Sequence, residues 1–395
     1  MEAMVWSQGR ICPVAAASGP SRRPGGAGAE AERAPRRSGN LAHEICPHRE
    51  VAKGRTKMTC APSPVLDRSA TVEQVRRLML KQAAADQPIR SCRVALVGQR
   101  LNSVLFRAEC DVPQRLFLIK VCAEFDTDPV TAAHEEYAAL AAISNAMGEN
   151  SRFTVPRPSP ALLQNGCVVM NWVEGVSLLQ QMTDWRTPPW RVLGSVRRAG
   201  EWLNRFHHAR TFEIGHIDTD RLSGMVDTAF IQARLPPAWL PIVECARRFL
   251  DQHAERVGRV PVQGGWRHGD FKPENVMLSG DRVFGIDIER IGQIECLRDV
   301  VNFLFHLDLQ LLSPRSLHLL PFRRHIYRSF LKGYAGDKVE LGPDNLAGRW
   351  LYLQRLLRFW ADIEFTRRGT ARLWYARYLL RHLIATSLLD PPPPG

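Results

Sequence analysis

A run of polar residues in the C-terminal half of the chain has the composition of a phosphoryl-transfer loop. It reads His268-Gly269-Asp270-Phe271-Lys272-Pro273-Glu274-Asn275, and Ile286-Asp287-Ile288-Glu289 follows it. Phosphoryl transfer needs a carboxylate that accepts the proton of the attacking hydroxyl, and oxygen ligands for the Mg²⁺ that neutralises phosphate charge. Asp270 is a candidate for that base, and Asn275 and Asp287 are candidates for the metal ligands.

A short β-hairpin must bring these residues together. The pattern of residues 275–287 predicts two strands that turn at Ser279-Gly280-Asp281. The residues at the open end of a tight antiparallel hairpin lie side by side, so Asn275 and Asp287 are expected to be neighbours. One loop and one hairpin would then supply a base and two metal ligands.

The elements that position this loop divide into a strand-rich part and a helix-rich part. Helices are expected over residues 71–84 and 131–147, and strands over 93–97, 104–109, 115–122, 162–164 and 167–172, the last two as a hairpin turning at Asn165-Gly166. After Gly175 the pattern is mostly helical. We therefore predict an α+β fold with two lobes, residues 65–172 and residues 173–390.

The loop and the hairpin together resemble a known family. His-Gly-Asp-Phe-x-x-x-Asn-Val, followed by Ile-Asp-x-Glu after a hairpin, is similar to the motif of the aminoglycoside phosphotransferase/choline kinase family. The resemblance implies a bilobal protein-kinase-like fold, with a small antiparallel sheet and one helix in the first lobe and a larger helical second lobe. It also implies ATP and Mg²⁺ as cofactors, Asp270 as the catalytic base, and Asn275 and Asp287 as the Mg²⁺ ligands.

One part of the loop departs from that family. Lys272-Pro273-Glu274-Asn275 looks more like the catalytic loop of serine/threonine protein kinases, in which the corresponding Lys contacts the transferred phosphate. Lys272 is therefore assigned to the catalytic residues. Against a protein kinase, Asp287 is followed by Ile288-Glu289 and not by Phe-Gly, and no Ala-Pro-Glu closes an activation segment. We favour a small-molecule hydroxyl as acceptor, with a protein kinase, a lipid-linked-sugar kinase and a nucleotide-binding pseudokinase scaffold as alternatives.

A single lysine in an apolar strand marks the nucleotide side. Lys120 lies in Leu116-Phe117-Leu118-Ile119-Lys120-Val121, where a cation is costly unless an anion meets it. The resemblance implies that this lysine binds the nucleotide phosphates and pairs with a Glu of the next helix. Glu136 is favoured over Glu135 because it shares a helical face with apolar residues such as Leu140.

Two further segments are expected to contact the nucleotide. Residues 98–103 lie where a phosphate-covering loop belongs, although they lack a G-x-G-x-x-G pattern. Residues 168–175 resemble the family's inter-lobe hinge, whose backbone would bind adenine. The residues assigned to the nucleotide are Lys120, Glu136, Gly98, Asn102, Ser103, Met170, Asn171 and Val173.

Charge is distributed unevenly along the 395 residues, whose formal net charge is +13. Residues 1–57 hold 10 Lys/Arg and 5 Asp/Glu, residues 58–312 hold 29 of each, and residues 313–395 hold 14 and 6. Aromatic residues are interleaved with the arginines of the last segment, which in the family helps to wall the acceptor cleft. This pattern suits an anionic or sugar-like acceptor better than a polycation, because like charges repel; a solvated arginine face is the competing interpretation. No nucleic-acid recognition motif is present, so no nucleic-acid partner is expected.

The two ends of the chain are expected to be disordered. Residues 1–64 are rich in Gly, Ala, Pro and Arg without a sustained period, and residues 391–395 are almost entirely proline. Residues 1–57 read as a dispensable extension, with Met58 as an alternative start. No apolar run reaches the length of a membrane span, and the nine cysteines form no C-x-x-C pair, so a cytoplasmic protein with reduced thiols is predicted. The oligomeric state is left open.

Overall fold

The computed structural model describes most of the chain from residue 66 onward. The described residues are 66, 69–82, 89, 91–99, 103–111, 115–122, 128–148, 151–210, 215–226, 231–232, 234–262, 264–288, 294–336, 345–366 and 377–385. They belong to a compact unit, Val65–Gly395, that is separate from Met1–Pro64. The predicted disordered ends, 1–64 and 391–395, lie outside the described residues.

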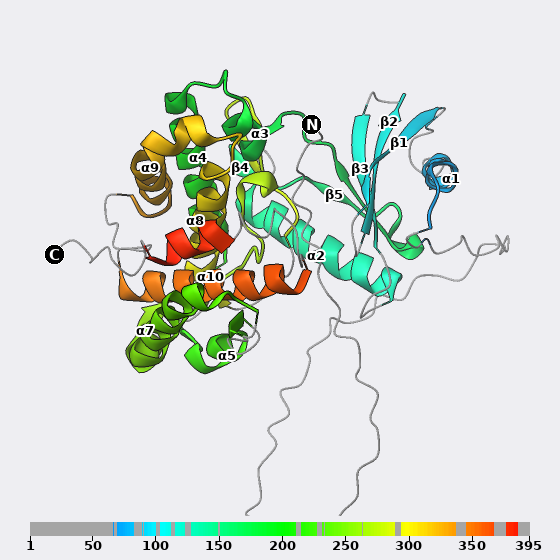
Figure 1. Cartoon of the computed structure of the whole chain (residues 1–395). Coiled ribbons are helices and arrows are strands. Elements are labelled where there is room, and N and C mark those ends of the chain that lie inside the picture. The colour runs from blue at the N-terminus through cyan, green and yellow to red at the C-terminus, as the bar shows by residue number, and fades with distance from the viewer. Residues whose placement is uncertain are drawn as a thin grey trace, which may run out of the picture. The chain divides into compact units, whose positions relative to one another are not determined.

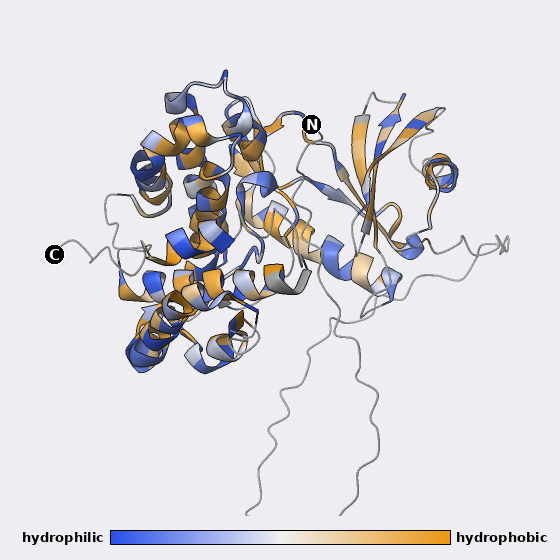
Figure 2. Cartoon of the chain, viewed as in Figure 1, coloured by the Kyte–Doolittle hydropathy of each residue, from blue (hydrophilic) through white to orange (hydrophobic). Residues whose placement is uncertain are grey.

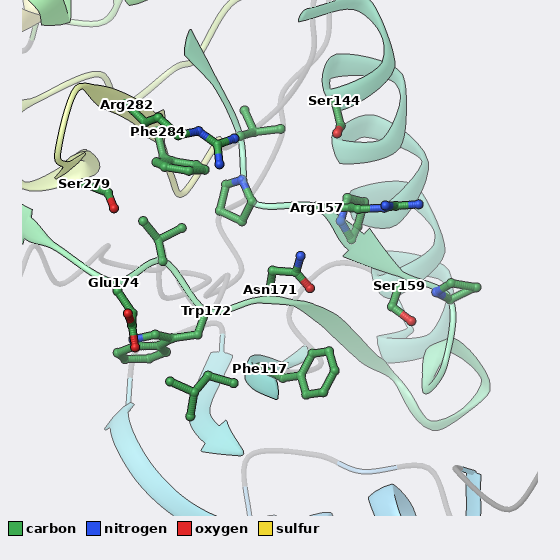
Figure 3. A pocket seen from close by; sticks show the side chains of 16 residues that line it. Phe117, Ser144, Arg157, Ser159, Asn171, Trp172, Glu174, Ser279, Arg282 and Phe284 are labelled. Carbon is green, nitrogen blue, oxygen red and sulfur yellow. The ribbon is translucent and has the colours of Figure 1, made fainter. Parts of the chain in front are cut away.

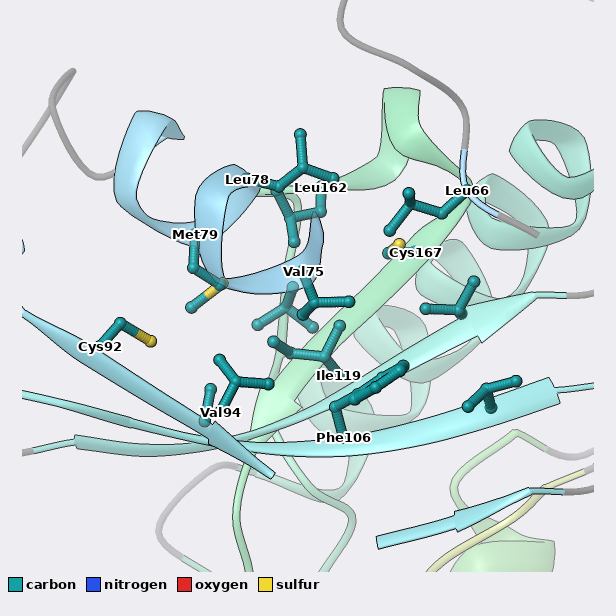
Figure 4. Close-up of a cluster of buried hydrophobic side chains, with 14 of the residues drawn as sticks. Leu66, Val75, Leu78, Met79, Cys92, Val94, Phe106, Ile119, Leu162 and Cys167 are labelled. Atoms are coloured by element: carbon teal, nitrogen blue, oxygen red, sulfur yellow. The ribbon is translucent and has the colours of Figure 1, made fainter. Parts of the chain in front are cut away.

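A five-stranded antiparallel sheet forms the first lobe (Figure 1). Its strands, in spatial order, are β1 (Cys92–Gln99), β2 (Ser103–Cys110), β3 (Arg115–Cys122), β6 (Cys167–Asn171) and β5 (Pro158–Ser159). Helix α1 (Val72–Gln82) packs on one face of this sheet, where Val75 contacts a buried cluster that includes Phe106 and Ile119 (Figure 4). Because side chains alternate along a strand, Lys120 lies on the opposite face from Ile119.

Helix α2 (Pro129–Met147) packs against strands β3 and β6. Asp128 caps its N-terminus by accepting hydrogen bonds from the backbone N–H groups of Val130 and Thr131, and Pro129 follows at the first helical position. Leu140 and Ile143 are buried, which fixes the face that the helix turns inward. The long helix that the sequence predicted at 131–147 is therefore present.

One predicted hairpin is wrong. Residues 162–164 do not form a strand, because Leu163–Asn165 is a 3₁₀ turn that ends at Gly166 with φ 72°. Strand β6 pairs instead with β3 and β5. Leu162 and Leu163 are both buried, which strand alternation would not allow on a half-exposed sheet. An Asn-Gly pair fits the end of a 3₁₀ turn as well as a hairpin turn, so the dipeptide was ambiguous.

The second sheet carries the hairpin predicted at residues 275–287. Its order is β4 (Phe153–Thr154), β12 (Arg282–Gly285), β11 (Val276–Ser279) and β7 (Val176–Ser177). Ser279 pairs with Arg282, and Gly280 has φ 60°, a conformation that glycine adopts without strain. The parallel pairing of β12 with β4 ties the hairpin to the segment that follows α2.

Helices form most of the second lobe, as the sequence predicted. They are α3 (Leu178–Thr183), α4 (Pro189–His208), α5 (Thr219–Gly224), α7 (Leu240–Gly258), α8 (Leu297–Leu311), α9 (Arg323–Ala335) and α10 (Leu346–Thr366), with 3₁₀ turns η2 (Pro237–Trp239), η3 (Pro273–Asn275) and η4 (Leu317–Phe322). Two short ladders pair β8 (Gly215–His216) with β9 (Pro261–Val262) and β10 (Gly264–Gly265) with β13 (Ile294–Glu295). The α+β, bilobal fold class is confirmed.

The described helices carry both apolar and hydrophilic residues (Figure 2). Among them, no helix has both the length and the apolarity that a membrane span requires.

Candidate active site

The loop at 268–275 is anchored by a buried carboxylate from helix α8. Asp299 accepts hydrogen bonds from the backbone N–H groups of His268 at 2.6 Å and of Gly269 at 3.1 Å. Nε2 of His207 lies 3.3 Å from the same carboxylate. Burial raises the pKa of Asp299, but its contact with His207 and the nearby cationic groups outweigh that effect, so the pKa lies below the usual range. The backbone of the loop is thus held by an ionised carboxylate.

Two histidines, His207 beside the loop and His268 at its first position, have structural roles. Nδ1 of His207 lies 2.8 Å from the Tyr334 hydroxyl, so this fully buried side chain is a hydrogen-bonded core histidine. His268 is fully buried against the rings of Trp202 and Phe271, and burial lowers its pKa. Its ring is therefore neutral at pH 7 and packs the loop against α4.

The polar side chains of the loop converge on Asp270. Nδ2 of Asn275 donates to the backbone carbonyl of Asp270 at 2.8 Å and to its Oδ2 at 3.3 Å. Nζ of Lys272 lies 2.6 Å from the same Oδ2 and 3.5 Å from Glu274. The 3₁₀ turn Pro273–Asn275 closes this arrangement through a hydrogen bond from Asn275 N–H to the Lys272 carbonyl at 2.9 Å. Since Asn275 uses its amide nitrogen toward Asp270, its Oδ1 is directed elsewhere.

The hairpin brings Asp287 to the same place. Ile286 N–H donates to the Asn275 carbonyl at 3.0 Å, and Val276 pairs with Gly285. The two predicted metal ligands therefore lie at the open end of one hairpin. Asp287 has φ 61°, an unusual conformation for a residue with a side chain, and such backbone strain is concentrated at functional sites.

An ion pair approaches this hairpin from the first lobe. Lys120 Nζ lies 2.8 Å from both Oε1 and Oε2 of Glu136, and the two side chains are 16% and 23% exposed. The sequence prediction of Glu136 over Glu135 is therefore correct. Burial opposes the charged ammonium, but the Glu136 and Asp287 carboxylates outweigh it and raise the pKa of Lys120. Because the Asp287 carboxylate contributes to this rise in pKa, Lys120 of strand β3 faces the open end of the hairpin.

The donor atoms at this place fit Mg²⁺. The carboxylate of Asp287 and Oδ1 of Asn275 are hard oxygen ligands, and Mg²⁺ is commonly held by one or two such groups together with phosphate oxygens and water. Across the part of the chain that the structure describes, no group of three or more His, Cys, Asp or Glu could bind a metal by itself. The residues therefore suit a metal that arrives with a phosphorylated ligand.

A cavity of about 1050 Å³ lies beside the hinge (Figure 3). It is lined by hinge residues 171–174, by residues 155–160, and by the hairpin side chains of Ser279, Arg282 and Phe284. The predicted residues Asn171 and Val173 line it, whereas Lys120 and the loop at 268–275 do not. The backbone N–H of Asn171 donates to the Arg157 carbonyl at 3.0 Å, so that donor is already used within the protein.

The remaining residues assigned to the nucleotide lie on strands of the first lobe. Met170 pairs with Leu118, so it lies on the sheet face that also carries Lys120. Ser103 begins β2, and its buried Oγ has no hydrogen-bond partner among the described residues. Gly98 lies at an irregularity of β1, where nothing would contact a Cβ within 4 Å. Asn102 lies outside the described residues.

Two residues close to the loop were not assigned to the site from the sequence. Asn302 donates from Nδ2 to the Phe271 carbonyl at 3.0 Å, and Arg355 donates from Nε to Asn302 Oδ1 at 3.0 Å. Asp299, Asn302 and His306 share one face of α8 at spacings of three and four, and that polar row in an apolar helix was a usable signal. No sequence pattern pointed to Arg355, because its partner Asn302 is distant in the sequence.

The fold and these side chains define a protein-kinase-like phosphotransferase. A family model described as phosphotransferase enzyme family matches residues 97–319, more than half of the chain. The chain therefore belongs to that family. A comparison with curated proteins finds no match.

Solved structures of small-molecule kinases are similar to the chain. A glucosamine kinase in complex with glucosamine, ADP and inorganic phosphate matches with TM-score 0.52 and 17% identity, covering 80% of this chain and 83% of that one. A spectinomycin phosphotransferase in complex with ADP and spectinomycin matches with TM-score 0.51 and 10% identity, covering 81% and 99%. An aminoglycoside phosphotransferase in complex with AMP-PNP and hygromycin B matches with TM-score 0.50 and 14% identity, covering 80% and 99%. At these identities the similarity establishes the fold.

Proposed function

We propose that this phosphotransferase transfers the γ-phosphate of ATP to a hydroxyl group of a small molecule, with Asp270 as the catalytic base. The observation that carries the proposal is the convergence of Asp270, Asn275 and Asp287 at one loop and one hairpin. Nδ2 of Asn275 lies 3.3 Å from the Asp270 carboxylate, and the charge of Asp287 helps to raise the pKa of Lys120. A base, two oxygen ligands and a phosphate-binding cation are what phosphoryl transfer requires.

In the proposed reaction, the acceptor hydroxyl oxygen forms a bond to the γ-phosphorus while the bond to the bridging oxygen of ADP breaks. Asp270 takes the hydroxyl proton, and the products are ADP and a phosphate ester. Lys120, fixed by Glu136, binds the nucleotide phosphates, and Lys272 stabilises the transferred group. Asn275 and Asp287 would hold Mg²⁺, which when bound supplies positive charge to the phosphates. Catalysis then comes mainly from positioning and charge stabilisation.

The solved relatives support the nucleotide and the acceptor class. Their complexes contain ADP or AMP-PNP together with glucosamine, spectinomycin or hygromycin B. The short segment between Asp287 and helix α8 also favours a small-molecule acceptor over a protein. Helix α8 begins at Leu297, which leaves little room for the activation segment of a protein kinase. The buried free thiols of the described part of the chain suit a cytoplasmic location, where ATP is available.

The test is transfer of labelled γ-phosphate from ATP to a panel of sugars, amino alcohols and aminoglycosides, with lysate proteins as a separate arm. The wild type should give a labelled small molecule, and Asp270→Asn should lower kcat by about 10³-fold or more. Asp251→Asn is the matched control, because that carboxylate lies in an exposed pair with Arg247 on α7. Label on protein alone would favour a protein kinase. Nucleotide binding without transfer to any arm would favour a pseudokinase scaffold.

A further inference from the structure

An arginine of helix α10 is tied to the catalytic loop through one amide side chain. Nε of Arg355 donates to Oδ1 of Asn302 at 3.0 Å, and Nδ2 of Asn302 donates to the carbonyl of Phe271 at 3.0 Å. Phe271 follows Asp270 directly. The guanidinium is therefore positioned relative to the proposed catalytic base by two hydrogen bonds, from a helix that does not line the cavity beside the hinge.

Arg355 packs against aromatic rings and forms no ion pair with the residues that the structure describes. Its Cζ lies 4.8 Å from the ring centroid of Phe305 and 5.9 Å from that of Phe359, so aromatic rings support the planar group. Within the described ranges, its sole hydrogen bond comes from Nε, and no carboxylate forms an ion pair with it. Burial, aided by Arg358, lowers its pKa to about 10, although Asp362 and Asp270 oppose that shift. The side chain is half-buried, and its two terminal nitrogens form no hydrogen bond with the described residues, so they are available to an anion.

The surroundings of Arg355 carry further positive charge. The charge of Arg267 contributes to the lowered pKa of Arg355. The buried Nε of Arg267 has no hydrogen-bond partner among the described residues, and Oδ1 of Asp299 lies 3.9 Å from it. Nζ of Lys272 lies 2.6 Å from Oδ2 of Asp270 on the same loop. His306 lies one turn after Asn302, and its buried Nε2 also has no partner in the described part of the chain. This side of the loop therefore offers donors and cations around one catalytic carboxylate.

We propose that Arg355, positioned by Asn302, is an anion-binding residue for the acceptor, so that the acceptor is a hydroxyl compound carrying a carboxylate or a phosphate group. The inference rests on the proposed function, because it assigns the substrate class of the same site. The planar guanidinium can bind either group with two parallel hydrogen bonds, which also fixes the direction of the adjacent hydroxyl toward Asp270. An acceptor bearing an ammonium group would be repelled by Arg267, Lys272 and Arg355.

The charge preference can be measured with acceptors that share a sugar skeleton. Glucosamine, glucose, gluconate and glucose 6-phosphate carry a cationic, a neutral, a carboxylate and a phosphate group, and each retains several hydroxyls. With labelled ATP, we expect kcat/KM of the wild type to be at least about tenfold higher for the anionic pair than for glucose, and lowest for glucosamine. The ratio between gluconate and glucose 6-phosphate distinguishes the two kinds of anion.

Three variants separate an anion-binding role from a structural one. Arg355→Gln should lose about 10- to 100-fold in kcat/KM toward the anionic acceptors, mainly through KM, and should lose the preference over glucose. Arg355→Lys keeps the charge without the planar fork and should recover part of that loss. Arg328→Gln removes an exposed arginine from α9 and should leave the preference unchanged. Thermal unfolding and nucleotide binding identify any variant that is misfolded.

The inference and the proposed function can fail separately. If glucose or glucosamine is preferred by the wild type, or if Arg355→Gln keeps the anionic preference, the anion-binding role is overturned while phosphotransfer stands. If no acceptor is phosphorylated, the proposed function fails. The anion-binding role of Arg355 is then tested by the binding of anionic compounds, measured as a shift in melting temperature. A rise in melting temperature with glucose 6-phosphate or gluconate in the wild type, absent in Arg355→Gln, would support it. Equal rises in both proteins, or none in either, would refute it.

Discussion

The ammonium of Lys272 lies 2.6 Å from Oδ2 of Asp270, so the base of the proposed reaction is in contact with a cation of its own loop. Asn275 donates to the same oxygen at 3.3 Å. Both side chains orient the carboxylate through one oxygen and leave Oδ1 for the proton of the acceptor. The resemblance assigned Lys272 to the transferred phosphate, and the structure places it against the Asp270 carboxylate.

Replacement of Lys272 tests this arrangement. Lys272→Met keeps the length of the side chain but removes the charge, so kcat should fall by about 10²-fold with a smaller change in the KM for ATP, as expected for a group that acts mainly in the transition state. Steady-state kinetics with varied ATP and acceptor measure both constants. Lys81→Met, at an exposed position of α1, should leave them unchanged. A rise in KM with kcat unchanged would show that Lys272 binds ATP equally in the ground state and the transition state.

The adjacent glutamates of α2 provide a matched pair for the nucleotide side. Glu136→Gln removes the carboxylate that fixes Lys120 at 2.8 Å, whereas Glu135→Gln changes an exposed residue that precedes it. We expect the first variant to raise the KM for ATP and lower kcat/KM by about tenfold or more, because Lys120 loses its orientation. The second variant should match the wild type. Equal effects from both would mean that the ion pair does not position the nucleotide.

Much of the site was predictable because its residues are close in the sequence or lie on regular elements. Asp270 and Asn275 belong to one loop, and the hairpin that carries Asp287 follows from alternation and a Ser-Gly-Asp turn. The family resemblance implied that Lys120 pairs with a Glu of the next helix, and helical periodicity chose Glu136 over Glu135; these two residues form an ion pair.

The parts that could not be predicted depend on packing between distant segments. Arg355 reaches the catalytic loop through Asn302, and no local pattern relates those two positions. Strand β4, at Phe153–Thr154, is too short to carry a periodic signal, and its parallel pairing with β12 is made by tertiary contact. At Asn165-Gly166 two turn types share one sequence signature, so local reasoning alone could not choose the 3₁₀ turn.

Close packing behind the hairpin makes the position of Asp287, the proposed metal ligand, sensitive to a small substitution. A Cβ at Gly285 would lie 2.1 Å from the ring of Trp202, which is fully buried and donates from Nε1 to the Thr154 carbonyl. Gly285→Ala should therefore displace the end of β12 and move Asp287. We expect kcat to fall and the Mg²⁺ concentration at half-maximal activity to rise by about tenfold.

The control for this change is another glycine. Gly194→Ala lies on α4, where no heavy atom would approach the new Cβ within 4 Å, so activity should not change and stability should stay equal or rise slightly. A magnesium titration of initial rates compares the two variants. An unchanged Mg²⁺ requirement in Gly285→Ala would show that the hairpin accommodates the methyl group without moving Asp287.

The anchor of the catalytic loop predicts a pH-dependent loss of stability. Asp299 is fully buried and accepts hydrogen bonds from His268 and Gly269, and its pKa lies below the usual value despite burial, because His207 and nearby cations stabilise the carboxylate. A carboxyl group whose pKa is lowered by folding stabilises the protein above its unfolded pKa of about 3.9, and that stabilisation is lost as the pH falls through the folded pKa. Asp299→Asn removes the charge at every pH.

We expect Asp299→Asn to lower the free energy of unfolding by about 2–4 kcal/mol at pH 7, because the loop amides and His207 lose a charged acceptor. Urea unfolding between pH 7 and pH 3 should show the gap between variant and wild type nearly constant down to about pH 4 and then shrinking. Asp251→Asn, on the exposed face of α7, should show no such gap. A gap that persists unchanged to pH 3 would mean that the loss arises from packing of the amide and not from the charge. The ionised state of Asp299 would then not be what holds the catalytic loop.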